Sequence, residues 1–172
     1  QLPIGRRGAN AHMAAGHAVT LIDLRKTPLP AFDDSQIYAD QNLHYLNEVI
    51  RKVDGVTLAV PVYNWAVGSA AIEATGSNIA RLGLRSPWSD KVVTCLVAGG
   101  VLQSYTAHMS LASSLMLDFK CVNPYHVFAA SADWNGDNLS ESALERLEKT
   151  LQVAIQFSAA LRGCTYGSKW EI

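Results

Sequence analysis

The chain has 172 residues, of which 49% are hydrophobic and 17% are charged, and its formal net charge is −1 at pH 7. A single domain of this length can bury a sufficient core without disulfide or metal staples. The near balance of 14 Lys and Arg against 15 Asp and Glu argues against a nucleic-acid-binding protein.

The cysteines and the apolar runs indicate the cellular compartment of the protein. Cys95, Cys121 and Cys164 are widely spaced and contain no C-x-x-C pair, which fits neither a disulfide framework nor a zinc site. The longest apolar runs reach about ten residues, too few to span a bilayer, and the N-terminus has no signal-peptide apolar region. We therefore expect a cytoplasmic protein that does not bind membranes, with residues 1–172 forming one domain.

The chain opens on Gly5-Arg6-Arg7-Gly8-Ala9-Asn10. Backbone N–H groups at a helix start, together with arginine side chains, are suited to a phosphate group. We interpret Arg6, Arg7 and Asn10 as part of a phosphate-binding loop within residues 2–10; the alternative is a frayed basic terminus.

Apolar periodicity predicts alternating strands and helices along the rest of the chain. None of the predicted strands alternates cleanly between apolar and polar residues, which is typical of parallel strands covered on both faces. The pattern predicts an open, doubly wound parallel sheet between two helical layers, a three-layer α/β/α fold. The predicted strands are 17–24, 55–62, 91–97 and 121–130, and the predicted helices run from Tyr38 to a stop at Asp54-Gly55, over 105–119 and over 140–161.

Two details concern the last helix and the loop before it. We interpret Asn138 with Glu141 as a capping box at the helix start, and Gly163 as its C-terminal stop. Residues 133–138 are rich in Asp and Asn, but they lack a calcium-loop pattern, so we interpret them as a solvated loop.

In such a sheet, ligands bind outside the carboxyl ends of the strands. Tyr63 offers a π-face there and Asn64 a hydrogen-bonding amide, although Asn is also common in ordinary turns. Glycines let a ligand approach the backbone closely, and Trp65 either walls the ligand or joins a dimer interface. The candidate binding residues are Arg6, Arg7, Asn10, Pro61, Val62, Tyr63, Asn64, Trp65, Ala98, Gly99 and Gly100.

Three segments resemble the NADPH-dependent FMN reductase family. They are Asp54 to Asn64 (DGVTLAVPVYN), Lys91 to Gly100 (KVVTCLVAGG), and Gly16 to Leu24 followed by Pro28-x-Pro30. The resemblance implies a flavodoxin-like fold with non-covalent FMN, with NADPH or NADH as electron donor. It also implies that the Pro-x-Tyr-Asn turn lies along the flavin ring.

The chain departs from the family pattern at several positions. Val62 stands where the family usually has Glu, residues 65–69 replace a Gly-Ser-x-Pro-Gly run, and Ile72-Glu73 replace a Lys-Asn pair. A complete first strand, phosphate loop and helix need about 30 residues. The sixteen residues available mean that the first helix is drastically shortened or that the sequence omits residues.

The function expected from this resemblance is that of an enzyme, an NAD(P)H-dependent oxidoreductase that reduces flavin, quinone or another small organic acceptor. No metal-ligand spacing or hydrolase elbow is present, so we expect no metal site and name no catalytic side chain. The alternatives are a flavin-binding electron carrier and a biosynthetic flavoprotein with a dedicated organic substrate. The apolar helix 105–119 predicts a homodimer or homotetramer, and His108 on that helix is expected to be a core residue.

Overall fold

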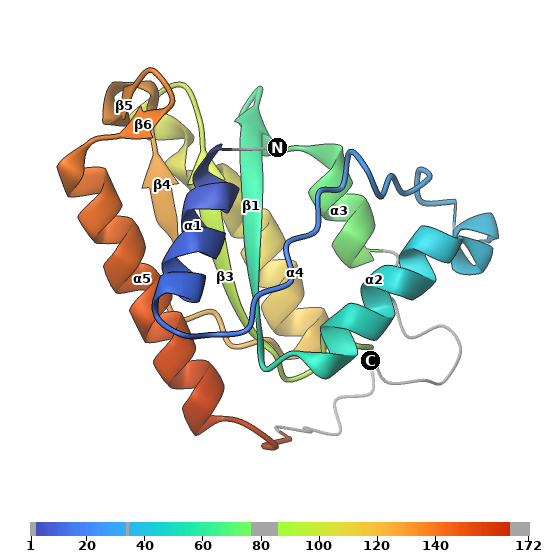
Figure 1. Cartoon of the computed structure of the whole chain (residues 1–172). Helices are drawn as coiled ribbons and strands as arrows, with labels where there is room; N and C mark the ends of the chain where they lie inside the picture. The colour runs from blue at the N-terminus through green and yellow to red at the C-terminus, as the bar shows by residue number, and fades with distance from the viewer. Residues whose placement is uncertain (1–2, 34, 77–85, 166–172) are drawn as a thin grey trace.

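The computed structural model describes residues 3–33, 35–76 and 86–165. Its central sheet has the strand order β2-β1-β3-β4 (Figure 1), in which β1, β3 and β4 are parallel and β2 returns antiparallel to β1. The strands are β1 (Gly55–Tyr63), β2 (Ala66–Val67), β3 (Val92–Ala98) and β4 (Val127–Ala129). The parallel sheet predicted from unbroken apolar runs is confirmed.

Helices cover both faces of the sheet, which confirms the predicted three-layer architecture. One layer holds α1 (Pro3–Ala14) and α5 (Glu141–Ala160), and the other holds α2 (Gln41–Lys52), α3 (Ser69–Gly76) and α4 (Met109–Phe119). The 3-10 helices Gln36–Ala39, Leu102–His108 and Ser131–Asp133 and the hairpin of β5 (Trp134–Asn135) and β6 (Asn138–Leu139) complete the elements. No helix in the described part of the chain is long and apolar enough to cross a membrane.

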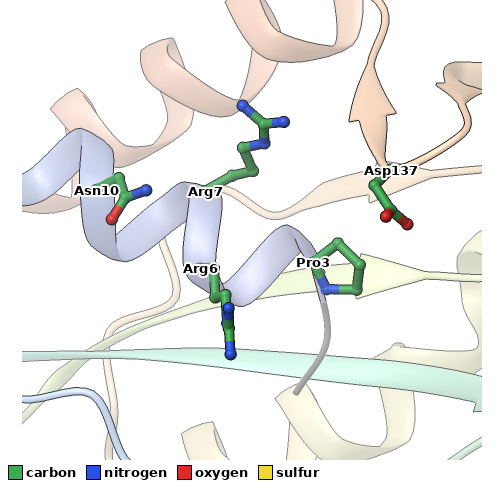
Figure 2. Close-up of a pocket in the computed structure, with 5 residues that line it drawn as sticks. All are labelled: Pro3, Arg6, Arg7, Asn10 and Asp137. Atoms are coloured by element: carbon green, nitrogen blue, oxygen red, sulfur yellow. The ribbon is translucent and has the colours of Figure 1, made fainter.

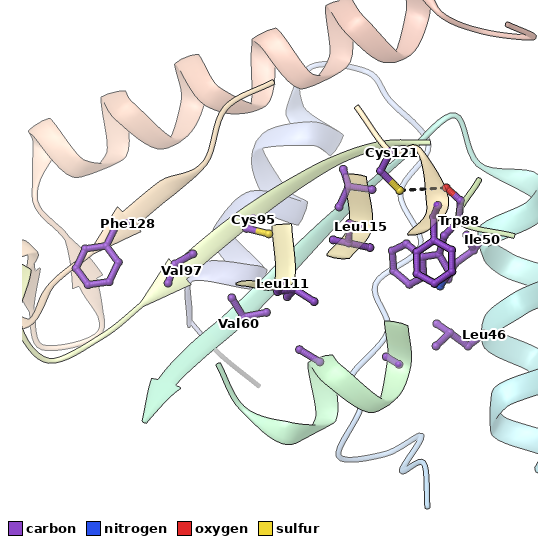
Figure 3. Packing of buried hydrophobic residues seen from close by; sticks show 14 of the residues in the cluster. Leu46, Ile50, Val60, Trp88, Cys95, Val97, Leu111, Leu115, Cys121 and Phe128 are labelled. Carbon is purple, nitrogen blue, oxygen red and sulfur yellow. Dashed lines mark hydrogen bonds between the residues drawn. The ribbon is translucent and has the colours of Figure 1, made fainter. Parts of the chain in front are cut away.

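The two faces of the sheet carry two separate apolar cores. Successive side chains of a strand point to opposite faces, so on β3 Cys95 and Val97 enter one core and Leu96 enters the other. In the larger core (Figure 3), the Cys121 thiol donates to the Trp88 carbonyl oxygen at 3.2 Å. Because β3 is buried on both faces, it is the centre around which the helices pack.

The strand predicted at residues 17–24 is wrong. The segment is irregular, although its Ile22 and Leu24 side chains pack against the larger core. Within the described residues, residues 18–22 make no backbone hydrogen bond to another segment. Apolar, β-branched residues favour a strand only where a neighbouring backbone pairs with them in register, and here none does. The predicted strand 121–130 is likewise reduced to β4, because Val122 forms only an isolated bridge with Val92.

The helix boundaries also differ from the predictions in places. The cap of α5 is Ser140, whose hydroxyl accepts from the Ala143 N–H at 3.3 Å, so the capping box assigned to Asn138 is wrong. Residues 102–108 are 3-10 helix before α4 begins at Met109. Most of the expected phosphate-binding loop is instead the helix α1, an element that the periodicity had not indicated.

Candidate functional site

The carboxyl ends of the parallel strands meet the start of α1 at one edge of the sheet. Figure 1 shows the tip of β1, the first turn of α1 and the β5–β6 hairpin together at the top of the molecule. A surface cavity of about 450 Å³ opens there, as Figure 2 shows. Its lining residues are Pro3, Arg6, Arg7, Asn10 and Asp137.

The helix α1 presents its polar side chains to this cavity because its other side packs on the sheet. Ile4 is buried, and a Cβ added at Gly5 would stand 2.9 Å from the Ala59 Cβ. Glycine therefore lets the helix lie close to β1, which is a different role from the loop conformation that the sequence suggested. With that face buried, helical spacing turns Arg6, Arg7 and Asn10 away from the sheet.

The charge of the cavity favours an anion. Two guanidinium groups and one carboxylate, that of Asp137, line the cavity, and the first-turn N–H groups of α1 add the positive end of the helix dipole. The Arg7 guanidinium donates to the Asn138 side-chain oxygen on β6, which ties it to the β5–β6 hairpin. A group with several acceptor oxygens, such as a phosphate, fits these donors.

The turn between β1 and β2 displays two aromatic side chains at the same edge. Asn64 and Trp65 form the two-residue hairpin loop, with φ values of 47° and 64°. Two positive values in succession match the tight hairpin turn in which Asn-Gly is the preferred pair, and a tryptophan there costs on the order of 1 kcal/mol. Tyr63 and Trp65 are 65% and 63% exposed, so their ring faces are open to a planar ligand.

The two glycines after β3 differ in their surroundings. A Cβ at Gly99 would stand 2.9 Å from the Phe128 ring, whereas a Cβ at Gly100 would meet nothing within 4 Å. Neither has a positive φ. Packing against Phe128 therefore explains why position 99 is a glycine. The surroundings of Gly100, in contrast, leave room for a ligand.

Three of the sequence-predicted residues, Arg6, Arg7 and Asn10, line one cavity, while the other eight lie at the same sheet edge outside that lining. The segment 131–137 links the two groups, because the Ser131 N–H donates to the Gly100 carbonyl oxygen at 3.3 Å and Asp137 lines the cavity. Sequence reasoning missed Pro3 and Asp137. Asp137 lies in a segment that follows the predicted strand 121–130, so the carboxyl-end rule used for the other turns would have indicated it.

A pair of histidines lies under this edge. His108 is buried, as predicted, and its Nδ1 lies 2.6 Å from the Tyr105 carbonyl oxygen. The His126 Nδ1 accepts from the Cys95 N–H at 3.0 Å, and the two imidazole centroids are 4.8 Å apart. Burial and the nearby His108 lower the pKa of His126 to about 4, and burial lowers the pKa of His108 as well. In the described part of the chain, no three His, Cys, Asp or Glu side chains gather as metal ligands would.

Comparisons with known proteins agree with the sequence and the fold. A model of the NADPH-dependent FMN reductase family matches residues 6–135, and no curated protein matches the chain. Among solved structures, the flavoenzyme NAD(P)H:(acceptor) oxidoreductase FerB from Paracoccus denitrificans is 16% identical, with a TM-score of 0.67 over 93% of this chain and 91% of that one.

Two further structures share the architecture. A flavone reductase is 13% identical, with a TM-score of 0.72 over 96% of this chain and 60% of that one. A flavodoxin, WrbA-like protein from Agrobacterium tumefaciens is 15% identical, with a TM-score of 0.55 over 88% of this chain and 90% of that one. At these identities the structural matches show the fold alone.

Proposed function

The chain belongs to the NADPH-dependent FMN reductase family, and from that premise we propose that it passes electrons from NAD(P)H through FMN to flavin, quinone or another small organic acceptor. Membership makes the protein an oxidoreductase that uses FMN with NAD(P)H as donor. The observation that carries the site assignment is the cationic cavity at the start of α1, beside the turns that end β1 and β3.

The residues present fit FMN in shape and charge. The volume of about 450 Å³ lies within the range of about 300–1,000 Å³ that is usual for small-molecule sites. Arg6 and Arg7 supply donors for the phosphate dianion, and the open space at Gly100 leaves room for a ring edge. Asp137 opposes the phosphate charge, but the two guanidinium groups outweigh it.

The protein's part is to bind and orient, since FMN itself supplies hydride acceptance from NAD(P)H and onward electron transfer. Arg6, Arg7 and Asn10 would hold the phosphate end. The Asn64 amide would offer a hydrogen bond to an edge of the ring system, and the exposed rings of Tyr63 and Trp65 would shield its face from water. The remaining candidates, Pro61, Val62, Ala98, Gly99 and Gly100, form the backbone wall behind it.

The first experiment tests the function directly. We expect the purified protein, after incubation with an equimolar mixture of FMN and FAD and gel filtration, to retain a flavin absorption spectrum that NADPH or NADH bleaches in the absence of oxygen. Heat should release the cofactor, and chromatography should identify it as FMN. Retention of FAD, or of no flavin at all, would contradict the proposal.

A second experiment tests the cavity. Arg7→Ala removes one charged donor from a partly exposed phosphate contact, so we expect about a tenfold weaker affinity for FMN, measured by fluorescence quenching. Arg162→Ala is the matched control, because its guanidinium pairs with the Asp54 carboxylate at 2.8 Å, outside the candidate cavity. Equal FMN affinities of the two variants would show that the phosphate binds away from α1.

We also propose a homodimer, or a homotetramer, formed through the exposed apolar face of residues 102–117. Leu102 and Leu117 are 70% and 68% exposed, and Tyr105, Met109 and Met116 lie exposed between them in the chain. A patch of this kind is typical of a protein interface. The double variant Leu102→Asp and Leu117→Asp should have the mass of a monomer in light scattering. The control Phe157→Asp on α5 should keep the wild-type mass. An unchanged mass in the double variant would show that the interface lies elsewhere.

A further inference from the structure

The turns after β1 and β3, where the proposed function places the flavin ring, carry no charged side chain. Residues 61–69, which form the end of β1 and its return through β2, read Pro-Val-Tyr-Asn-Trp-Ala-Val-Gly-Ser. Residues 98–108, from the end of β3 through the following 3-10 helix, read Ala-Gly-Gly-Val-Leu-Gln-Ser-Tyr-Thr-Ala-His. The one side chain among them that titrates near neutral pH is His108, which is buried and whose pKa burial lowers. Both turns are therefore neutral at pH 7.

These two turns lie side by side. Pro61 of β1 pairs with Ala98 of β3, so the chain leaves both strands at the same level of the sheet. The 3-10 helix that follows β3 contacts β1 and β2 as well as β3. The exposed side chains of Tyr63 and Trp65 on one turn, and the half-exposed Val101 on the other, therefore border the same part of the sheet edge. We call these last three residues the apolar rim.

The turn after β4, the next strand of the sheet, adds no net charge to the apolar rim. Its Asp133 carboxylate accepts from the Ala130 N–H at 2.9 Å and pairs with the Arg146 guanidinium of α5 at 3.0 Å. Arg6 and Arg7 line the cavity at the start of α1, where the proposed function assigns them to the phosphate of FMN. The candidate site thus has a charged phosphate end and an uncharged end at the apolar rim.

Trp65 in this rim occupies a backbone conformation that disfavours tryptophan. Its φ of 64° lies in the left-handed region, where glycine carries no steric cost. The hydrogen bond from the Gly68 N–H to the Pro61 carbonyl oxygen at 3.0 Å closes the hairpin that contains the turn. Because Trp65 is 63% exposed, packing within the described part of the chain does not explain the indole. A planar molecule that stacks on the indole explains it.

On the premise of the proposed function, we propose that the apolar rim selects an uncharged planar ring as electron acceptor, such as a quinone without an ionic group, and that Trp65 stacks on that ring. An anionic acceptor would lose its water of hydration at the rim without meeting a counter-charge, which costs binding free energy. Free FMN is a poor acceptor on the same ground, because Arg6 and Arg7 are engaged by the resident cofactor. The reduced nicotinamide ring of the donor is itself planar and uncharged, so donor and acceptor can use the rim in turn.

The overall reaction with a quinone balances without a further reactant. NAD(P)H donates a hydride, which carries two electrons and one proton, and becomes NAD(P)+. The quinone takes both electrons and that proton, together with one proton from water. Its two carbonyl groups thereby become the two hydroxyl groups of a hydroquinone.

The test compares naphthoquinone with its ring sulfonate, two acceptors that share a ring system and differ in charge. Both are assayed with the FMN-loaded whole chain and NADPH or NADH in the absence of oxygen. The sulfonate group withdraws electrons and makes the ring a stronger oxidant, so a slower reduction of the sulfonate reports selection at the site and not driving force. We expect kcat/KM for naphthoquinone to exceed that for the sulfonate at least about tenfold.

The outcomes separate this proposal from the proposed function. Equal kcat/KM values, or a preference for the sulfonate, overturn the selection of an uncharged acceptor, while bleaching of the bound flavin by the donor still supports the proposed function. A chain that retains no FMN overturns the proposed function, and the selection at the rim with it.

A charge placed at position 65 tests the part of Trp65 in this selection. Trp65→Arg keeps a flat group that can stack and adds a positive charge, so the preference for naphthoquinone over the sulfonate should fall at least about tenfold. Tyr125→Arg is the matched control, because Tyr125 is almost as exposed as Trp65 but precedes β4, at the amino end of the parallel strands. Solvent ions screen a charge over the length of a strand, so the control should keep the preference within about twofold of the wild type.

Two further variants test stacking without a change of charge. Trp65→Ala should raise KM for naphthoquinone about fivefold, and Trp65→Phe should keep KM within about twofold of the wild type, because a benzene ring still stacks. FMN retention after gel filtration shows that each variant is folded. An unchanged preference in Trp65→Arg, or the same loss of preference in Tyr125→Arg, overturns the assignment of Trp65.

Discussion

Gly99→Val is expected to lower the free energy of unfolding by about 2–3 kcal/mol, the upper range for overpacking a well-filled core. The added Cβ would stand 2.9 Å from the Phe128 Cζ, closer than real Cβ atoms come, and 3.1 Å from its Cε2, which is tighter than most real contacts. Phe128 is itself buried in the larger core, with its ring 6.0 Å from that of Tyr105 on the 3-10 helix, so it has little room to yield. Urea denaturation measures the change, and any loss of FMN should follow the loss of fold.

Matched variants make this result specific. Gly100→Ala should change stability by less than about 0.5 kcal/mol, because nothing lies within 4 Å of the added Cβ. Phe128→Leu should cost stability alone but recover part of the loss when it is combined with Gly99→Val, a coupling that a double-mutant cycle detects. If the stability losses of Phe128→Leu and Gly99→Val are additive, or if Gly99→Val keeps the wild-type urea midpoint, the Phe128 ring is not what requires glycine at position 99.

Acidification from pH 6.5 to pH 4 is expected to cost about 2 kcal/mol of stability through His126, after allowance for partial exposure of the ring. Burial and the neighbouring His108 lower the pKa of His126 to about 4 in the folded state, against about 6.5 in the unfolded chain. Between these values the unfolded chain binds more protons, so its population grows as the pH falls. The stabilisation is complete above pH 6.5 and is lost as the pH falls through 4.

His126→Asn tests the assignment. The amide oxygen of Asn can accept from the Cys95 N–H, as the His126 Nδ1 does at 3.0 Å, but it does not titrate in this range. The variant should show a shallower fall in unfolding free energy between pH 6.5 and pH 4, with a residual slope from His108, whose pKa burial also lowers. An unchanged slope would mean that His126 is solvated in the native protein.

Elements with a strong local pattern and a packed neighbour were predictable from sequence. The strands at 55–62 and 91–97 and the helices beginning near 41 and 141 appear close to their predicted bounds. The family resemblance rested on the first two of these, on the turns after them and on Gly16 to Leu24 with Pro28-x-Pro30. The helix α1 was missed because its Gly5 and Gly8 weaken the helical pattern, yet their lack of side chains lets the helix pack against Ala59 and Leu96.

By itself the sequence predicted the fold class, because apolar periodicity is a local property, and it indicated the family through the resemblance of three segments. The position of the site at the carboxyl ends of β1 and β3 stays a prediction. Only the tertiary structure decided whether each local preference found a partner. Residues 17–24 have the residues of a strand but pair with no neighbour. Asp137 reaches the cavity of Arg6 and Arg7 because β4 and the β5–β6 hairpin bring it beside α1. The Phe128 ring is what requires glycine at position 99. Pairing and packing join residues that are distant in the chain, and no local pattern records which neighbour the fold provides.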